Sequence, residues 1–223
     1  MSAYSPPPDN GLTIVFADEH LLVVDKPAGL LSVPGRGEGK DDCLVSRVQA
    51  KFADALAVHR LDMSTSGLLL LARGAAMHSA LSRLFRERLV DKRYLAEVEG
   101  CLEAEAGEID LPLICDWPNR PRQKVDFEIG KRSLTRFRTL FRDPSGLSSR
   151  VELEPVTGRS HQLRVHLAAL GHPIIGDELY GSGSLESGER LRLHATDLRF
   201  IHPLSMLPLD FHCEAPFCRG LTV

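Results

Sequence analysis

Short apolar runs separated by polar turns are the dominant pattern of this chain, and they are typical of β-strands joined by loops. Residues 13–16 and 21–25 predict two strands around the polar turn 17–20, and the five apolar residues 68–72 predict a buried strand directly after Gly67. Further strands are predicted over residues 93–98, 123–129, 135–141, 150–154, 193–200 and 209–214.

Three segments have the spacing of helices instead. Residues 44–52 predict a short helix, and residues 75–88 predict a longer one whose Leu81, Leu84 and Phe85 share a face. A third helix is expected over 161–170, with Ser160 as its N-cap and Gly171 at its end. The proline-rich segment 110–121 is expected to be an extended excursion outside the core. Together these elements predict an α+β fold with a large, mainly antiparallel sheet.

The chain length and composition fit a soluble, core-forming protein. Its 223 residues allow one large domain or two closely packed halves, and 43% hydrophobic residues suffice for a core. Residues 1–10 contain no apolar signal-peptide region and are expected to form a flexible lead. No apolar stretch reaches the length of a membrane span, so we expect a cytoplasmic protein without membrane contact.

Cysteine and histidine spacing argues against a metal site. The five cysteines are odd in number and form no Cys-x-x-Cys pair, which favours thiols in a reducing compartment. His161 and His166 are five residues apart and would not share a helical face. We therefore expect no metal.

Charge is unevenly distributed, although the net charge is only −3. Residues 120–142 contain eight basic and two acidic side chains, and residues 83–93 contain five basic and two acidic ones. Residues 97–116 contain seven acids and no Lys or Arg. Such polarity can present a basic face to phosphates, although a solvated surface of mixed charge is the alternative.

The sequence HRLDMSTSG at residues 59–67 contains one carboxylate, Asp62, close to a basic pair and to a run of small polar residues. Asp62 is expected on a turn at the edge of the core, within reach of Arg60. Burying an unpaired charge is costly, so a carboxylate held there needs a reason. A structural alternative is that Asp62 only caps a helix or a turn.

A second stretch, residues 156–166, carries Arg159 at the start of a predicted helix and Arg164 within it. Burying Arg164 would require an anion, and Asp62 is the candidate partner, since a paired Arg keeps a carboxylate ionised. Tyr94, at the start of a strand, offers a ring for stacking and a hydroxyl for proton transfer. The structural alternatives are a core Tyr94, a turn-capping Arg159, and satisfied core histidines at positions 161 and 166.

Ordered motifs then carry a resemblance over nearly the whole chain: VVDKPAG at 23–29, HRLD at 59–62 with TSG at 65–67, KRY at 92–94, GRSHQLRVH at 158–166, GHPI at 171–174, GD at 176–177 and LHA at 193–195. The chain resembles the RluA-type pseudouridine synthases. The segment 111–125 and the short N-terminus are most similar to the dual-specificity subgroup. The resemblance implies a pseudouridine synthase fold, with a large mixed sheet, flanking helices and a central active-site cleft. It also implies a single catalytic domain over 11–223 without an S4 domain.

The resemblance also implies a reaction and residue roles. Uridine in RNA would be isomerised to pseudouridine, with Asp62 as the catalytic aspartate, Arg164 as its partner and Tyr94 stacked on the target base. The implied reaction needs no metal and no cofactor. Arg60 would fill the space left by the flipped-out uridine, which fits the need to extrude a base before chemistry on it. RNA contacts are expected from Arg60, His59, Lys92, Arg93, Arg120, Arg122, Lys124, Arg159, His161 and Gln162. The implied substrates are stem-loops of tRNA and 23S rRNA, with the first anticodon-loop nucleotide and a hairpin-loop uridine as targets, and a monomer is expected.

Two other classes of function remain open at this point. A catalytically silent RNA-binding protein on the same scaffold would explain the basic segments but not Asp62 with Arg164. A hydrolase with an Asp nucleophile would want a second carboxylate two residues on and a bound cation, but position 64 is Ser. Full activity in a chelator would exclude the hydrolase.

Overall fold

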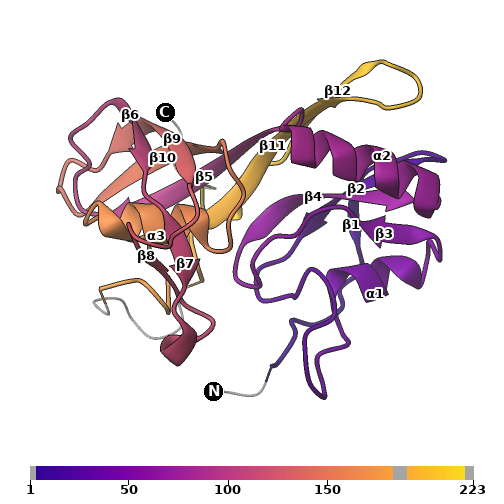
Figure 1. Ribbon diagram of the computed structural model, residues 1–223, viewed down its shortest axis with the longest axis horizontal. Coiled ribbons are helices and arrows are strands. Elements are labelled where there is room, and N and C mark those ends of the chain that lie inside the picture. The colour runs from indigo at the N-terminus through magenta and orange to yellow at the C-terminus, as the bar shows by residue number, and fades with distance from the viewer. Residues whose placement is uncertain (1–3, 183–189, 219–223) are drawn as a thin grey trace. The chain divides into compact units, whose positions relative to one another are not determined.

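The computed structural model describes residues 4–182 and 190–218, and the chain divides into two compact units (Figure 1). The first unit combines Met1–Asp91 with His194–Val223, and the second is Lys92–Leu193. The first unit is therefore built from two parts of the chain that are distant in sequence. Most of the expected loop 181–190 lies outside the described residues.

In its described residues the first unit contains six strands, two α-helices and a 3₁₀ turn: β1 (Thr13–Ala17), β2 (Leu21–Lys26), α1 (Leu44–Gln49), β3 (Ala55–Ala57), β4 (Ser66–Arg73), α2 (Gly74–Glu87), β11 (Leu193–Ile201), β12 (Pro208–His212) and η2 (Pro216–Cys218). The strand order is β1-β2-β4-β11, with β12 paired to β11 and β3 paired to β4. The β4–β11 pair is parallel, and the other pairs of this unit are antiparallel.

Strand β4 forms the centre of this unit because its apolar run 68–72 is buried on both faces. Helix α2 packs Met77 and Leu81 against the same core, to which β11 contributes Leu198 and Phe200. Gly67 adopts φ +111°, and a Cβ atom there would overlap the backbone of Ala195 in β11. Glycine is therefore required for the two parallel strands to approach each other.

The second unit contains six strands and one α-helix: β5 (Asp91–Glu99), β6 (Ala106–Asp110), β7 (Leu113–Cys115), β8 (Gln123–Val125), β9 (Leu134–Arg142), β10 (Ser148–Pro155) and α3 (Gln162–Ala169). Strands β5, β10, β9 and β6 follow one another in an antiparallel arrangement, and β7 and β8 form a separate hairpin. Buried side chains from the strands and from α3 form one core that includes Val98, Leu153 and Leu167.

Most predicted elements are present, but the structure corrects several boundaries. Ser160 is not the N-cap of α3: the helix begins at Gln162, after His161 in the left-handed region at φ 54°. The segment 110–121 is not wholly outside the core, because Leu113 is buried in β7, although residues 117–121, which include the 3₁₀ turn Trp117–Asn119, are exposed. Strands β3, β6 and β7 were not predicted. Across residues 4–182 and 190–218, no helix is both long and apolar enough to span a bilayer.

Candidate active site

The turn that carries Asp62 is tied to the rest of the first unit on both sides of this residue. On one side, Leu61 donates its N–H to Ser32 Oγ at 3.1 Å and accepts from the same hydroxyl at 2.7 Å. On the other side, Met63 O accepts from Gly29 N at 2.8 Å and from Lys26 Nζ at 3.1 Å. The half-buried Asp62 is thus held by its neighbours' backbones.

Lys26 is the anchor of this arrangement and was not singled out from the sequence. Its side chain is fully buried, and its ammonium group also donates to Pro27 O at 2.8 Å and Leu30 O at 2.7 Å. With Met63 O, three carbonyl oxygens surround a group that has three N–H donors. The loop after β2 and the turn at Asp62 are therefore held together by one side chain.

The two residues before Leu61 have different surroundings. Arg60 is exposed, as a side chain expected to enter RNA should be. His59 instead accepts the N–H of Leu70 on Nε2 at 2.9 Å, and its ring stacks on Phe85 with centroids 4.5 Å apart. These contacts give His59 a structural role within its unit, and its predicted contact with RNA remains a prediction.

In the second unit, Arg164 has a carboxylate partner that the sequence analysis missed. Its guanidinium donates from Nε to Asp177 Oδ2 and from Nη2 to Asp177 Oδ1, both at 2.7 Å. Both side chains are almost completely buried. The expectation that Arg164 needs an anion is confirmed, but the anion identified here is Asp177. Asp62 and Arg164 belong to different units, so their pairing remains a prediction.

Tyr180 connects this buried pair to the β7–β8 hairpin. Its ring lies 5.1 Å from the guanidinium carbon of Arg164 and 5.5 Å from that of Arg122. Its hydroxyl accepts from Gln123 N at 2.7 Å and is 2.8 Å from His161 Nδ1. The ring of Tyr180 therefore contacts both the buried Arg164 and Arg122, which is one of the residues expected to contact RNA.

Helix α3 is buried over its first six residues, which limits what it can offer to RNA. Gln162 is 3% exposed, and its amide bonds Thr157, Leu134 and Thr135 as well as Arg159 N. This burial argues against the predicted RNA contact by Gln162. The exposed Arg159, whose Nε donates to Arg132 O, remains accessible.

His166 is a satisfied core histidine, which is one of the alternatives left open by the sequence. Its Nε2 is 3.0 Å from Leu111 O and its Nδ1 is 2.9 Å from Thr135 Oγ1. The carbonyl can only accept, so the proton resides on Nε2 and Nδ1 accepts from the threonine hydroxyl. Burial lowers the pKa of His166 below its ordinary value of 6.5, so the ring is neutral at pH 7.

Tyr94 is half-buried on β5, opposite Leu153 of β10, and packs against the core of the second unit. Next to it, Arg93 forms a 2.9 Å ion pair with Glu154. Lys92 is half-buried. The three residues of the KRY motif thus begin a strand, as predicted, but their roles in catalysis and binding remain predictions.

The basic segment 120–142 separates into two parts with different character. In the β7–β8 hairpin, Arg120, Arg122 and Lys124 are exposed, and Arg120 lies 4.6 Å from the ring of Trp117, which is 65% exposed. On β9, by contrast, three arginines form ion pairs with glutamates: Arg136 with Glu108, Arg138 with Glu152 and Arg142 with Glu105. Within this segment the hairpin therefore presents Arg120 and Arg122 on the surface, with Lys124 paired to Asp126 at 3.2 Å, whereas β9 carries a mixed-charge surface.

Comparisons with known proteins give a consistent result. Residues 20–169 match the family model described as RNA pseudouridylate synthase. The chain is 52% identical to the dual-specificity RNA pseudouridine synthase RluA of Vibrio parahaemolyticus, over 96% of this chain and 90% of that protein. It is 50% identical to the protein of the same name from Yersinia pestis, over 92% of this chain and 100% of that protein.

Solved structures extend the similarity to the fold. Human RNA Pseudouridylate Synthase Domain Containing 1 matches with a TM-score of 0.80 and 32% identity, covering 98% of this chain and 89% of that chain. Human RNA Pseudouridylate Synthase Domain Containing 4 matches with a TM-score of 0.74 and 27% identity, covering 92% and 88%.

Proposed function

Since the chain belongs to the RNA pseudouridylate synthase family, we propose that Asp62 is the catalytic carboxylate of a dual-specificity pseudouridine synthase that modifies tRNA and 23S rRNA. Family membership confirms the resemblance drawn from the motifs, together with the α+β fold with its large, mainly antiparallel sheet. It also makes the protein an isomerase, in place of the silent RNA-binding protein or the hydrolase.

The isomerisation needs no net gain or loss of atoms. The bond between N1 of uracil and C1′ of ribose breaks, a bond between C5 and C1′ forms, a proton leaves C5, and N1 takes up a proton. An ionised Asp62 can attack C1′, add to C6 or remove the proton from C2′, and each route needs the carboxylate to be positioned. The tethers to Ser32 and Lys26 on either side of Asp62 are the observation that supports this assignment most directly.

The reacting nucleotide must leave the base stack before its glycosidic bond is accessible. The exposed Arg60 has the planar cation suited to fill the vacated space, and the half-buried Tyr94 offers a ring for the extruded base. We assign phosphate and base contacts to the hairpin residues Trp117, Arg120 and Arg122. Recognition by the shape of a folded loop allows two RNAs to share one site.

Replacing Asp62 by Ala or Asn tests the catalytic assignment. We expect either variant to abolish pseudouridine formation because the negative charge is lost, while RNA affinity changes less than about tenfold, roughly 1.4 kcal/mol. Pseudouridines are mapped in RNA from a strain that lacks the gene and carries wild-type or variant protein. Turnover by either variant would refute the assignment. Wild-type protein that restores neither the tRNA nor the 23S rRNA position would refute the substrates alone.

The hairpin surface can be tested against a matched region of equal formal charge. Replacing Arg120, Arg122 and Lys124 by Ala should lower RNA affinity and reduce its dependence on salt, because fewer counterions are released. The control replaces Arg136, Arg138 and Arg142, each of which is paired with a glutamate, whereas in the hairpin Lys124 is paired with Asp126. Filter binding at several salt concentrations measures both. Equal losses in the two triple variants would contradict a specific role of the hairpin in RNA binding.

A further inference from the structure

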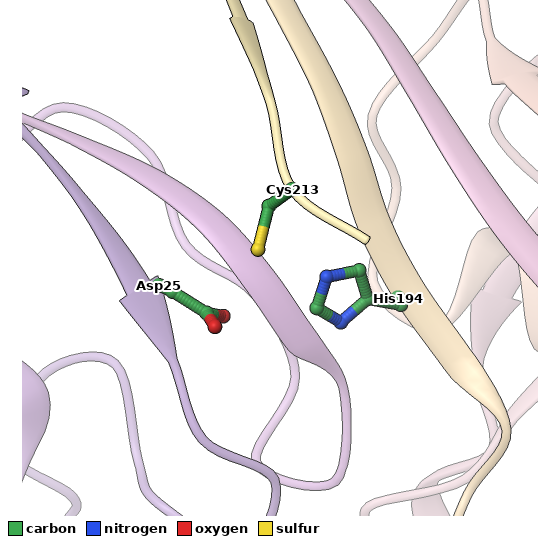
Figure 2. Close-up of side chains that lie close together, drawn as sticks. All are labelled: Asp25, His194 and Cys213. Carbon is green, nitrogen blue, oxygen red and sulfur yellow. The ribbon is translucent and has the colours of Figure 1, made fainter. Parts of the chain in front are cut away.

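Three side chains of different metal-ligand types meet in the first unit, at positions far apart in the sequence. Asp25 lies on β2, His194 on β11, and Cys213 directly after β12. One carboxylate oxygen, one imidazole nitrogen and the Cys213 sulfur all lie within 4.8 Å of one another. Figure 2 shows the carboxylate, the ring and the sulfur directed toward a common space.

The backbones that carry these side chains are fixed by strand pairing. Asp25 is opposite Leu68 of β4, and His194 is opposite Ser66 of the same strand. Cys213 donates its N–H to Thr196 O on β11 at 2.8 Å. In a tetrahedral site with bonds of about 2.0–2.3 Å, ligand atoms lie about 3.3–3.8 Å apart. The three ligand atoms, which lie within 4.8 Å of one another, would move closer together on binding an ion.

The orientation of His194 suits a ligand. The residue is 1% exposed, and its Nδ1 lies 2.8 Å from Ser66 Oγ, itself buried. The other ring nitrogen faces Cys213 in Figure 2. Histidines that bind a metal through one nitrogen usually donate the N–H of the other to a nearby oxygen, which fixes the tautomer and the ring orientation. Ser66 is placed to accept in this way.

We propose that Asp25, His194 and Cys213 bind a zinc ion. A thiolate with an imidazole and one carboxylate matches the ligand preference of zinc, whereas calcium and magnesium require oxygen ligands. Cys213 releases its thiol proton on binding, and the fourth coordination position takes a water molecule. The ion links β2, β11 and the chain after β12. It stabilises the first unit and takes no part in the chemistry at Asp62.

This site escapes detection in the sequence because its ligands stand at positions 25, 194 and 213, with no short spacing between them. Patterns such as Cys-x-x-Cys reveal only sites whose ligands are neighbours along the chain. The expectation of no metal rested on the absence of such spacing, and it remains untested.

The test uses the full-length protein, kept reduced, treated with a chelator and then freed of it. Titration with zinc should saturate at one ion per chain and raise the midpoint of thermal unfolding, and cobalt(II) should give a thiolate-to-metal charge-transfer band. Cys213→Ser and, separately, Asp25→Asn should lose the band and the zinc-dependent stabilisation. The control Cys115→Ser, which removes a half-buried thiol from the second unit, should retain both.

A wild-type protein without the cobalt–thiolate band, or an equal response in Cys213→Ser and wild type, would overturn the proposal. Asp25→Asn keeps the thiol, so it separates loss of a ligand from misfolding of the cysteine variant. Because these readouts are metal content, absorption and thermal stability, they do not depend on the proposed RNA substrates or on turnover.

Discussion

Each unit buries a long cationic side chain, and the two solve the same electrostatic problem with different partners. In the first unit, Lys26 directs its ammonium group to three backbone carbonyl oxygens. In the second, Arg164 forms a bidentate pair with Asp177 and lies against the ring of Tyr180. A compact ammonium with three N–H groups suits converging carbonyls, whereas a planar guanidinium matches the two oxygens of a carboxylate.

The different partners of the two cations determine which part of the structure each one holds in place. Lys26 draws together loop backbones, including the carbonyl of the residue after Asp62. Arg164 neutralises a buried charge, and Asp177 in turn accepts from the backbone N–H groups of Leu179 and Tyr180. Loss of Lys26 therefore leaves dipoles without a donor, whereas loss of Arg164 leaves a full charge without its counterion, which is the more costly state.

Replacing Arg164 by Met should produce the largest loss of stability. Removing one member of a buried ion pair costs about 3–5 kcal/mol, because the remaining buried carboxylate loses its counterion and keeps the weaker hydrogen bonds from Leu179 N and Tyr180 N. Urea unfolding measures the change. The double variant with Asp177→Asn removes both charges and should recover a large part of the loss. If Arg164→Met alone costs less than about 1 kcal/mol, the buried pair does not have the role described here.

Replacing Lys26 by Met should have an intermediate effect on stability, about 1–3 kcal/mol, because carbonyl oxygens lose their donor while the apolar stem is preserved. Met63 O keeps the N–H of Gly29, which limits the damage. Turnover should fall more than substrate affinity, since the turn at Asp62 is loosened. Steady-state kinetics and urea unfolding measure both, with the exposed Lys51→Met as the control. Unchanged turnover would argue against a positioning role for Lys26.

His166 differs from Lys26 and Arg164 because it is a buried base that is uncharged at pH 7. Burial lowers its pKa in the folded state, so on acidification the unfolded chain binds a proton first. The free energy of unfolding should therefore fall as the pH decreases below about 6.5, by at most about 1.4 kcal/mol per pH unit from this group. His166→Gln can keep both hydrogen bonds but cannot titrate, and should flatten this dependence. An identical pH profile for the variant would contradict the assignment.

The elements predicted well are those with strong local signals. The five-residue apolar run makes β4 recognisable, and the spacing of Leu81, Leu84 and Phe85 places α2 within one residue of its observed ends. Strand β3 has only three residues, and β6 has one buried residue, Ile109, so neither shows a usable periodicity. These strands form because neighbouring strands provide hydrogen-bond partners, which a single sequence does not reveal.

In the candidate site, too, the features that depend on neighbouring residues were predictable, and those that depend on residues distant in the sequence were not. The turn at Asp62 was predictable from adjacent polar residues, as was the need of a buried Arg164 for an anion. The identity of that anion depends on a carboxylate thirteen positions away, and the role of Lys26 depends on a carbonyl thirty-seven positions away. The Gly-Asp motif at 176–177 was the available signal for Asp177, but spacing alone did not connect it to α3.

The parallel pairing of β4 with β11, which requires Gly67, has a consequence for biosynthesis. During translation the ribosome releases β4 and then the whole of Lys92–Leu193 before β11 emerges. The second unit can begin to fold on the nascent polypeptide, while the N-terminal half of the first must wait for Leu198 and Phe200 to complete its core. Completion of the core around β4 is thus coupled to the last strands synthesised.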